Sequence, residues 1–361
     1  MQIFQDRQAL HRIPEWGLDL PKTTAYVTRS LEQRNCQVFH PIPSSVCAFF
    51  DFGAERTIAF RADMDALPIQ EKTGLSFASE HAGAMHACGH DGHTAVLLEL
   101  ARRLEHKKLD RNVLLIFQPG EESPGGARPL CETGVLEKYH VEAIFALHLW
   151  PGLEKGVVHS RVGEMMSRAS ELTVTVTGKS AHIGKAEEAL DAMAAAVRFY
   201  EQAIAMEQAI DPAIYRLLKF GRMCSGTARN IVSAETVMEG SLRAFDDGIF
   251  EQMKNALYTI AQNVEKETGC SVTLQLSEGY PVVYNPKAVW DKVTQILPVR
   301  HLEKPSLITE DFSYYQRRIP GMLFFMGLGD TPALHTNTFN FDETLLLKGV
   351  ELFELLAEQY R

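Results

Sequence analysis

The segment Met85–His93 concentrates metal-binding side chains within nine residues. It reads MHACGHDGH and supplies one thiol, three imidazoles and one carboxylate. Two glycines allow the backbone to turn sharply, so several of these groups can converge. Because burying such a cluster is costly unless something binds it, a divalent transition metal is the natural occupant. Cys88 and His90 are the strongest candidate ligands, and no second Cys or His pair follows at zinc-finger spacing.

Further candidate ligands follow strand-like runs downstream. Glu121 and Glu122 come directly after the apolar run 112–119, His148 ends another such run, and His335 lies in ALHTNTFNFDE. Adjacent residues on an extended backbone point in opposite directions. One glutamate can therefore bind metal while the other faces a bound water, and a hydrolytic site needs both roles. Together these residues predict a metallohydrolase.

The stretch RADMDALP (61–68) ends a predicted strand with two aspartates. We expect Asp63 to orient a metal ligand, because ligating side chains usually need a carboxylate behind them. For Asp65, a solvated turn residue and a functional residue are equally good interpretations, since aspartate is common in turns.

Length and composition narrow the class of protein. The chain has 361 residues, too many for one typical core, and therefore predicts two domains. Its net charge of −10 argues against nucleic acid as the main partner, and no apolar run is long enough to span a membrane. The N-terminus has no signal-peptide core and the six cysteines show no disulfide spacing, so we expect a cytoplasmic protein with reduced thiols.

The hydrophobic pattern predicts an α/β fold. Strand-like apolar runs alternate with segments of helical spacing, and the runs lie at 46–52, 57–64, 112–119, 143–151 and 322–329. Nearly continuous apolar strands are typical of a buried parallel sheet. We therefore predict a mostly parallel sheet with helices on both faces.

From residue 169 the pattern changes to half-exposed strands and long helices. Strands are expected at 171–180, 215–225, 235–245 and 271–277, and helices at 187–209 and 247–268. This β-α-β-β-α-β order is ferredoxin-like. We predict an inserted domain at 169–281, with 1–168 and 282–361 forming the metal-binding domain.

The motifs RADMDALP, MHACGHDGH, QPGEESPGGA, ALHLWP, TEDFSYY and LHTNTFNFDE occur in this order over nearly the whole chain. Together they resemble the amidohydrolase subgroup of metallopeptidase family 20. That subgroup includes aminoacylases, hippurate hydrolases, auxin-conjugate hydrolases and N-acetyldiaminopimelate deacetylases. The resemblance implies a catalytic α/β domain and an inserted lid domain that mediates dimerisation in relatives. A tetramer is the alternative assembly.

The resemblance also implies a site with two divalent metal ions per subunit. Carried over by position, the ligands would be Cys88, His90, Glu122, His148 and His335. Cys88 would bridge the two metals and Glu121 would be the general base. Imidazole, carboxylate and thiolate ligands suit Zn²⁺, Mn²⁺, Co²⁺ or Ni²⁺, and the sequence does not choose among them.

Three residues of the inserted domain match positions that act on the substrate in relatives. His182, in GKSAHIG, would stabilise the oxyanion, and relatives often send this histidine into the partner's site. Asn230 and Arg243 would lie near the substrate carboxylate, which suits an arginine fork. A surface-turn histidine and a solvated strand arginine are the alternatives. The chain departs from many relatives after His182, where a proline and a second histidine are absent.

The predicted activity is metal-dependent hydrolysis of the amide bond of an N-acyl, and within that class an N-acetyl, amino acid. N-Acetyldiaminopimelate deacetylation is the most concrete version. A dipeptidase or carboxypeptidase of the same fold is an alternative, and so is a non-catalytic metal-binding relative. The last is disfavoured because Glu121 and every ligand position are present, and because structural metal sites are usually thiolate-rich.

Overall fold

The computed structural model describes residues 1–361, which form two compact units. Unit 1 comprises Met1–Met165, Val283–Pro305 and Glu310–Arg361, and unit 2 comprises Met166–Val282 and Ser306–Thr309. The short return of the chain to unit 2 has no counterpart in the sequence pattern. It is fixed by tertiary contacts, because the Ser167 N–H donates to the carbonyls of Ser306 and Ile308, at 3.0 and 3.1 Å.

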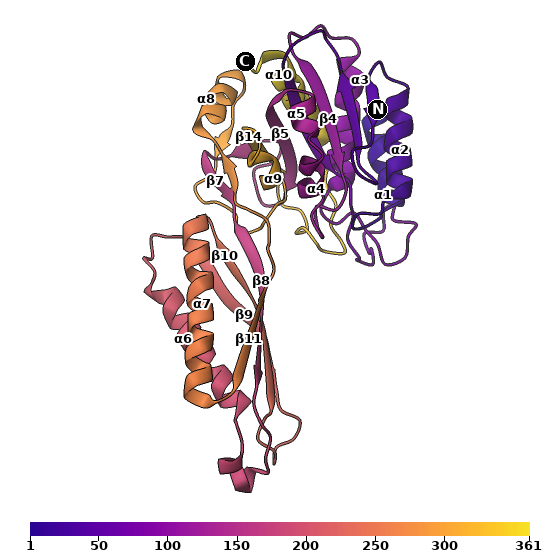
Figure 1. Ribbon diagram of the computed structural model, residues 1–361. Helices are drawn as coiled ribbons and strands as arrows, with labels where there is room; N and C mark the ends of the chain where they lie inside the picture. The colour runs from indigo at the N-terminus through magenta and orange to yellow at the C-terminus, as the bar shows by residue number, and fades with distance from the viewer. The chain divides into compact units, whose positions relative to one another are not determined.

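Unit 1 contains an eight-stranded sheet in the order β1-β2-β4-β3-β5-β14-β6-β13 (Figure 1). The strands are β1 (Gln37–Phe39), β2 (Val46–Phe50), β3 (Thr57–Asp63), β4 (Asn112–Gln118), β5 (Val141–Trp150), β14 (Gly321–Gly327), β6 (Val158–Ser160) and β13 (Arg300–His301). The four central strands β4, β3, β5 and β14 are parallel neighbours. This arrangement confirms the predicted α/β class with a mostly parallel sheet.

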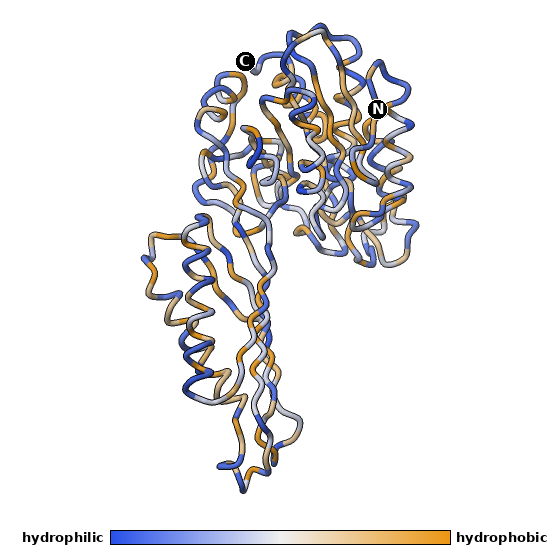
Figure 2. The backbone as a smooth tube through the Cα atoms, viewed as in Figure 1, coloured by the Kyte–Doolittle hydropathy of each residue, from blue (hydrophilic) through white to orange (hydrophobic).

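The central strands are apolar because both faces of the sheet are covered. Every residue of β3, β4 and β14 is buried, so these strands lack the polar alternation of a half-exposed strand. Figure 2 shows hydrophobic residues concentrated along these strands. The covering helices are α1 (Gln2–Arg12), α2 (Pro21–Glu32), α3 (His90–Leu104), α4 (Ala127–Glu132), α5 (Val135–Lys138), α8 (Lys287–Ile296), α9 (Ser313–Gln316) and α10 (Leu346–Gln359).

Helix α3 is the central helix of unit 1 and starts in the metal-binding motif. It packs on β3, β4 and β5 and is flanked by α1, α2 and α10. Gly89 precedes it in a left-handed conformation, with φ of +91°, which a residue with a side chain adopts only at a cost. The glycine of the motif therefore allows the chain to turn from Cys88 into the first turn of the helix.

Unit 2 has the predicted ferredoxin-like topology. Its antiparallel sheet has the order β11-β8-β10-β9, and the helices α6 and α7 pack on it. The elements are β8 (Arg168–Thr177), α6 (Ala192–Ala209), β9 (Arg216–Ser225), β10 (Glu235–Ala244), α7 (Asp247–Thr268) and β11 (Ser271–Leu276). A short two-stranded sheet joins β7 (Gly163–Met166) to β12 (Val283–Asn285).

One helix boundary differs from the prediction. Helix α6 begins at Ala192 rather than near residue 187, because the Asp191 carboxylate caps it by accepting from the N–H groups of Met193 and Ala194. The residues before it form a 3₁₀-helix, Ile183–Glu188. Helix α10 is also preceded by a 3₁₀-helix, Glu343–Leu345, which the Asp342 side chain caps. No helix combines the length and apolar character needed to cross a membrane.

Candidate metal centre

The candidate ligands gather at one edge of the unit 1 sheet. Glu121 and Glu122 follow the C-terminal end of β4, and His148 lies near the C-terminal end of β5. His335 lies in the segment after β14, and its amide donates to the Ala87 carbonyl over 2.8 Å. In open α/β sheets, ligands bind outside the carboxyl ends of the strands. Parallel pairing of β4, β3, β5 and β14 brings residues distant in the sequence to this edge.

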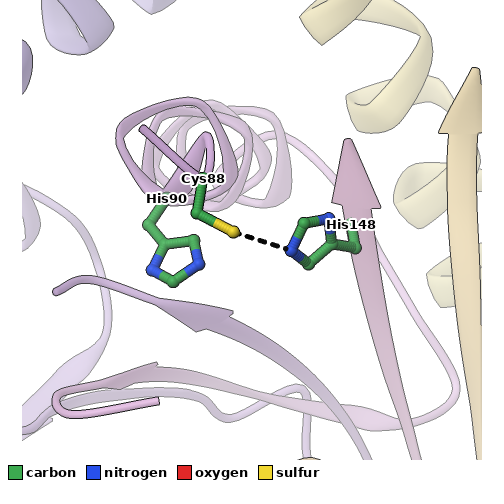
Figure 3. Close-up of side chains that lie close together, drawn as sticks. All are labelled: Cys88, His90 and His148. Carbon is green, nitrogen blue, oxygen red and sulfur yellow. Dashed lines mark hydrogen bonds between the residues drawn. The ribbon is translucent and has the colours of Figure 1, made fainter. Parts of the chain in front are cut away.

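Cys88, His90 and His148 form the innermost group (Figure 3). Their ligand atoms lie within 4.8 Å of one another and all three residues are buried. The Cys88 Sγ atom lies 3.4 Å from His148 Nε2. Cys88 lies two residues before the start of α3 and His90 is its first residue, whereas His148 comes from β5, so only the tertiary fold brings His148 to the other two.

Two further groups extend this cluster. In one group, ligand atoms of Cys88, Glu122 and His335 lie within 4.8 Å of one another. In the other, the same holds for His90, Glu121 and Glu122. Cys88 thus belongs to two groups, as a bridging ligand would. The His335 Nε2 atom lies 3.0 Å from Glu122 Oε1. His335 has a φ of +61°, a left-handed conformation that is rare outside glycine and that clusters at functional sites.

Hydrogen bonds from Nδ1 set the orientation of the His90 and His148 imidazoles. The Nδ1–H of His90 donates to the Asp65 carbonyl, and that of His148 donates to the Leu149 carbonyl, each over 2.8 Å. These bonds leave the Nε2 atom of each ring for a ligand. The His90 Nε2 atom is buried and has no hydrogen-bond partner. A buried nitrogen without a partner next to a thiol and a carboxylate fits a bound cation.

The electrostatics of the cluster also fit a cation. Burial, followed by the charges of Glu122 and Glu121, raises the pKa of the Cys88 thiol well above its usual value. Burial alone would lower the pKa of His90, but the charge of Asp63 and the hydrogen bond to Asp65 raise it to about 10. The pocket therefore holds an excess of negative charge. A divalent ion would neutralise that charge and displace the thiol proton.

Asp63 lies among the candidate ligands but contacts a different histidine from the expected ones. Its Oδ1 atom lies 2.6 Å from His93 Nδ1, whereas its Oδ2 atom lies 3.9 Å from the His90 Nε2 atom. The His93 Nε2 atom in turn accepts from the Leu149 amide over 3.0 Å. Asp63 thus orients His93, which fixes the backbone next to His148.

Asp65 is a structural anchor of the site rather than a solvated turn residue. Its two carboxylate oxygens accept from the backbone N–H groups of Glu121 and Glu122, at 2.9 and 3.0 Å. The two glutamates therefore lie in a turn, not on the extended backbone that the sequence analysis assumed. In the sequence, the only signal for this role of Asp65 is the spacing of two aspartates, Asp63 and Asp65, at the end of β3. That signal can be interpreted only when the order of the strands in the sheet is known.

Sequence reasoning missed two acidic residues next to Glu121. Glu310 and Asp311 are buried, and their carboxylate oxygens lie within 4.8 Å of each other and of Glu121. Burial and then the charge of Glu310 raise the pKa of Glu121 well above its usual value. Burial also raises the pKa of Asp311, to about 8. The motif TEDFSYY, which carries part of the family resemblance, supplies this acidic pair.

One buried arginine balances these acids. Arg61 donates to Asp63 and to Asp311, each over 2.7 Å, and to Gln118 over 2.9 Å. Its Nη2 atom also lies 3.0 Å from Glu310 Oε1. Arg61 therefore links the aspartate behind the candidate metal cluster to the acidic pair beside Glu121.

In unit 2, His182 and Asn230 lie side by side, whereas Arg243 is remote from them. His182 forms an isolated bridge with Ile231, and the Ile183 amide donates to the Asn230 carbonyl. These residues lie beyond the Glu235 end of β10. Arg243 is eight positions along β10, so the separation is roughly 25 Å. Its Nη1 donates to the Leu307 carbonyl over 2.5 Å.

A second buried polar group lies beneath the first turn of α3. His11 Nδ1 lies 2.8 Å from Asp91 Oδ2, and the Arg7 Nε–H donates to the same oxygen over 3.3 Å. All three residues are buried. Burial opposes protonation of His11, but the hydrogen bond and charge of Asp91 outweigh it and raise its pKa to about 9.

This pair predicts a loss of stability at alkaline pH. Because the pKa of His11 is higher in the folded protein, protonated His11 stabilises the fold. This contribution is complete below the pKa of the unfolded chain, near 6.5, and is lost as the pH rises through about 9. The expected contribution is about 3 kcal/mol. We expect the free energy of unfolding, measured by urea titration, to fall more steeply over this range in the wild type than in His11→Gln. Equal slopes would contradict the assigned pair.

Comparisons with known proteins agree with this geometry. Residues 59–359 match the model of "Peptidase family M20/M25/M40". An N-acetyldiaminopimelate deacetylase from Limosilactobacillus fermentum is 32% identical, over 97% of this chain and 95% of its own length. A dinuclear metal binding peptidase of the M20 family from Bacillus subtilis is 30% identical with a TM-score of 0.85, covering 99% and 96% of the two chains.

A second solved structure has an even closer backbone. A putative aminohydrolase from methicillin resistant Staphylococcus aureus has a TM-score of 0.90 at 29% identity, covering 98% of this chain and 95% of its own. The match to the family model spans most of the chain, and the relatives align from end to end. The chain therefore belongs to peptidase family M20/M25/M40 and is an amide-bond hydrolase of that family.

Proposed function

We propose that the protein is a metal-dependent amidohydrolase that splits N-acyl amino acids into a carboxylic acid and a free amino acid. One observation carries the proposal: a mixed set of thiol, imidazole and carboxylate donors converges beside a further buried glutamate, Glu121. Such a set suits an open catalytic site better than a closed structural one. The proposed ligands of two divalent ions are Cys88, His90, Glu122, His148 and His335.

The residues of this chain then have separate roles. Bound cations would lower the pKa of a water and polarise the acyl carbonyl. Glu121 takes the proton from the attacking water and delivers it to the leaving amine. Asp65 holds Glu121 in place through the backbone, and Arg61 holds the acids behind it. His182 donates to the oxyanion that develops during attack.

N-Acetyldiaminopimelate is the first substrate to test. Support comes from a full-length relative named N-acetyldiaminopimelate deacetylase, at 32% identity. A second relative of that name, from Exiguobacterium sibiricum, is 31% identical over 98% of both chains.

The decisive experiment is release of free amine from N-acyl amino acids by protein stripped of metal and reconstituted with Zn²⁺, Mn²⁺, Co²⁺ or Ni²⁺ separately. We expect no release by stripped protein and release after at least one cation is restored. Cys88→Ala should bind less metal and lose release, whereas Cys36→Ala, which alters a half-buried thiol outside the cluster, should not. Cleavage of dipeptides without release from any N-acyl amino acid would overturn the proposed substrate class.

We further propose that the working form is a homodimer joined through unit 2. Strand β9 is an open edge of the unit 2 sheet. Helix α6 exposes an apolar stripe of Met193, Val197 and Tyr200, each at least 40% exposed and spaced along one face. In addition, His182 and Asn230 lie together at one end of the unit 2 sheet, and Arg243 lies at the other end. They can serve one substrate only if two subunits supply them.

A mixing experiment tests this arrangement. Glu121→Gln and His182→Ala are each expected to be nearly inactive alone. In a mixed dimer, one site would combine an intact Glu121 with an intact His182 from the other subunit. Mixed, unfolded and refolded together, the two variants should regain about a quarter of the wild-type rate, because half of random dimers are mixed and carry one good site. Absence of recovery, with dimers present by light scattering, would contradict supply of His182 across the interface.

A further inference from the structure

The loop between α1 and α2 exposes two large apolar side chains. Trp16 is 55% exposed and Leu18 is 39% exposed, and Gly17 separates them. Neither has a role in the chemistry proposed above. Tryptophan is among the residues enriched at binding hot spots, and Leu18 adds apolar area beside it.

Both flanks of Trp16 are attached to the loops that carry the active-site acids. On one side, the Glu15 carbonyl accepts from the amide of Ala66, the residue after Asp65, over 2.7 Å. On the other side, Leu18 packs on Gly120, the residue before Glu121. A Cβ atom at Gly120 would lie only 2.6 Å from Leu18 Cδ2.

The loop is held rigidly in this position. The Glu15 carboxylate accepts from the Thr23 amide and hydroxyl, at 2.9 and 3.0 Å. The Leu20 amide donates to Ser44 Oγ over 2.9 Å, and the His81 Nδ1–H donates to the Pro14 carbonyl over 2.8 Å. A fixed loop presents its side chains at low entropic cost, which is what a recognition surface requires.

We propose that Trp16 and Leu18 form a specificity surface that contacts an apolar group of the substrate, carried by the acyl chain or by the amino-acid side chain. The inference rests on the proposed amidohydrolase function and narrows its substrate class. Because the pair adjoins the loops of Asp65 and Glu121, a substrate held for attack would place an apolar substituent against it. A substrate whose acyl group is acetyl and whose amino-acid side chain is polar would leave this surface without a contact.

The test compares two substrate series on metal-loaded protein. One varies the acyl group on alanine from acetyl to hexanoyl and benzoyl, and the other varies the amino acid of an N-acetyl derivative from alanine to leucine and phenylalanine. In at least one series, Trp16→Ala should lower kcat/KM for the bulky apolar members by about 10- to 100-fold. N-Acetylalanine should change by no more than a few fold. Leu18→Ala should show a smaller loss in the same series, and Trp16→Phe should retain most of the preference.

Tyr284→Ala is the matched control. Tyr284 is 48% exposed and lies on β12, which packs beside β14. Its amide donates to the Gln316 side chain, which also bonds the carbonyl of Gly321, the first residue of β14. That end of the parallel sheet is opposite the candidate metal centre. We expect this variant to keep the wild-type ratio of rates in both series.

Two outcomes would overturn the inference. The first is a preference unchanged within about twofold by Trp16→Ala in both series. The second outcome applies if the wild type turns over none of these substrates, a result that would by itself contradict the proposed function. Calorimetric titration of wild type and Trp16→Ala with N-hexanoylalanine and, separately, with N-acetylphenylalanine would then decide. Equal affinity of the two proteins for both ligands, or no binding of either ligand, overturns the surface, and a loss of affinity in the variant for at least one ligand upholds it.

Discussion

Glu121→Gln is expected to retain its metal and lose turnover by about 10²- to 10⁴-fold, the range for loss of a general base. The amide keeps the size of the side chain but cannot take the proton from the attacking water. Glu121 is buried beside the candidate ligand Glu122, where its carboxylate can reach a water held by the metal site. The measurement is kcat on the best N-acyl amino acid, together with metal content by mass spectrometry.

Two variants make the result specific to this position. Glu122→Gln removes a proposed ligand from the next residue and should reduce metal content as well as turnover. Glu132→Gln alters an exposed carboxylate on α4 and should change neither. A Glu121→Gln enzyme with near-normal kcat would remove Glu121 from the mechanism, and one without metal would assign it a ligand role instead.

Arg61→Met is expected to lower the free energy of unfolding by about 3–5 kcal/mol, the cost of breaking a buried ion pair from one side. The methionine fills much of the space but leaves Asp63, Glu310 and Asp311 buried without their shared cation. The pKa of Asp311 is already raised to about 8 by burial, with Arg61 opposing that rise. Without the arginine, this carboxyl should bind a proton still more readily. Urea unfolding monitored by circular dichroism measures the loss.

Arg56→Met is the matched control for this prediction. Arg56 lies one residue before β3, is 69% exposed at its side chain and pairs only with Glu142, over 3.2 Å. Exposed ion pairs contribute little, so the change should stay within about 0.5 kcal/mol. Arg61→Lys should fall between the two, since one ammonium cannot reproduce a planar fork with several acceptors. A loss in Arg61→Met no larger than in Arg56→Met would contradict a stabilising role for the buried network.

The sequence by itself determined the fold class and the elements of the site. Apolar runs such as 112–119 are long and unbroken because their strands are covered on both faces, and this signal is local to the chain. The density of donors in Met85–His93 is likewise visible without a structure, because a thiol and several imidazoles in so short a segment have few other uses. Glutamates and histidines at the ends of predicted strands could be named as further candidate ligands, because their side chains are also metal donors.

Only the tertiary structure decided which role each acidic residue of the site has. The turn of Glu121 and Glu122 depends on hydrogen bonds to Asp65, which lies two residues after the neighbouring strand β3. The pairing of Arg61 with Asp311 joins positions 250 residues apart. Such long-range contacts leave no periodic trace, since they follow from sheet order and not from local spacing.

The same limit applies to the substrate-facing residues. Trp16 reads as a loop residue until the structure places its neighbours against Ala66 and Gly120. The split of His182 from Arg243 becomes visible only when the strands of unit 2 are paired in register. Local periodicity specifies which elements form, whereas packing and register decide which side chains meet.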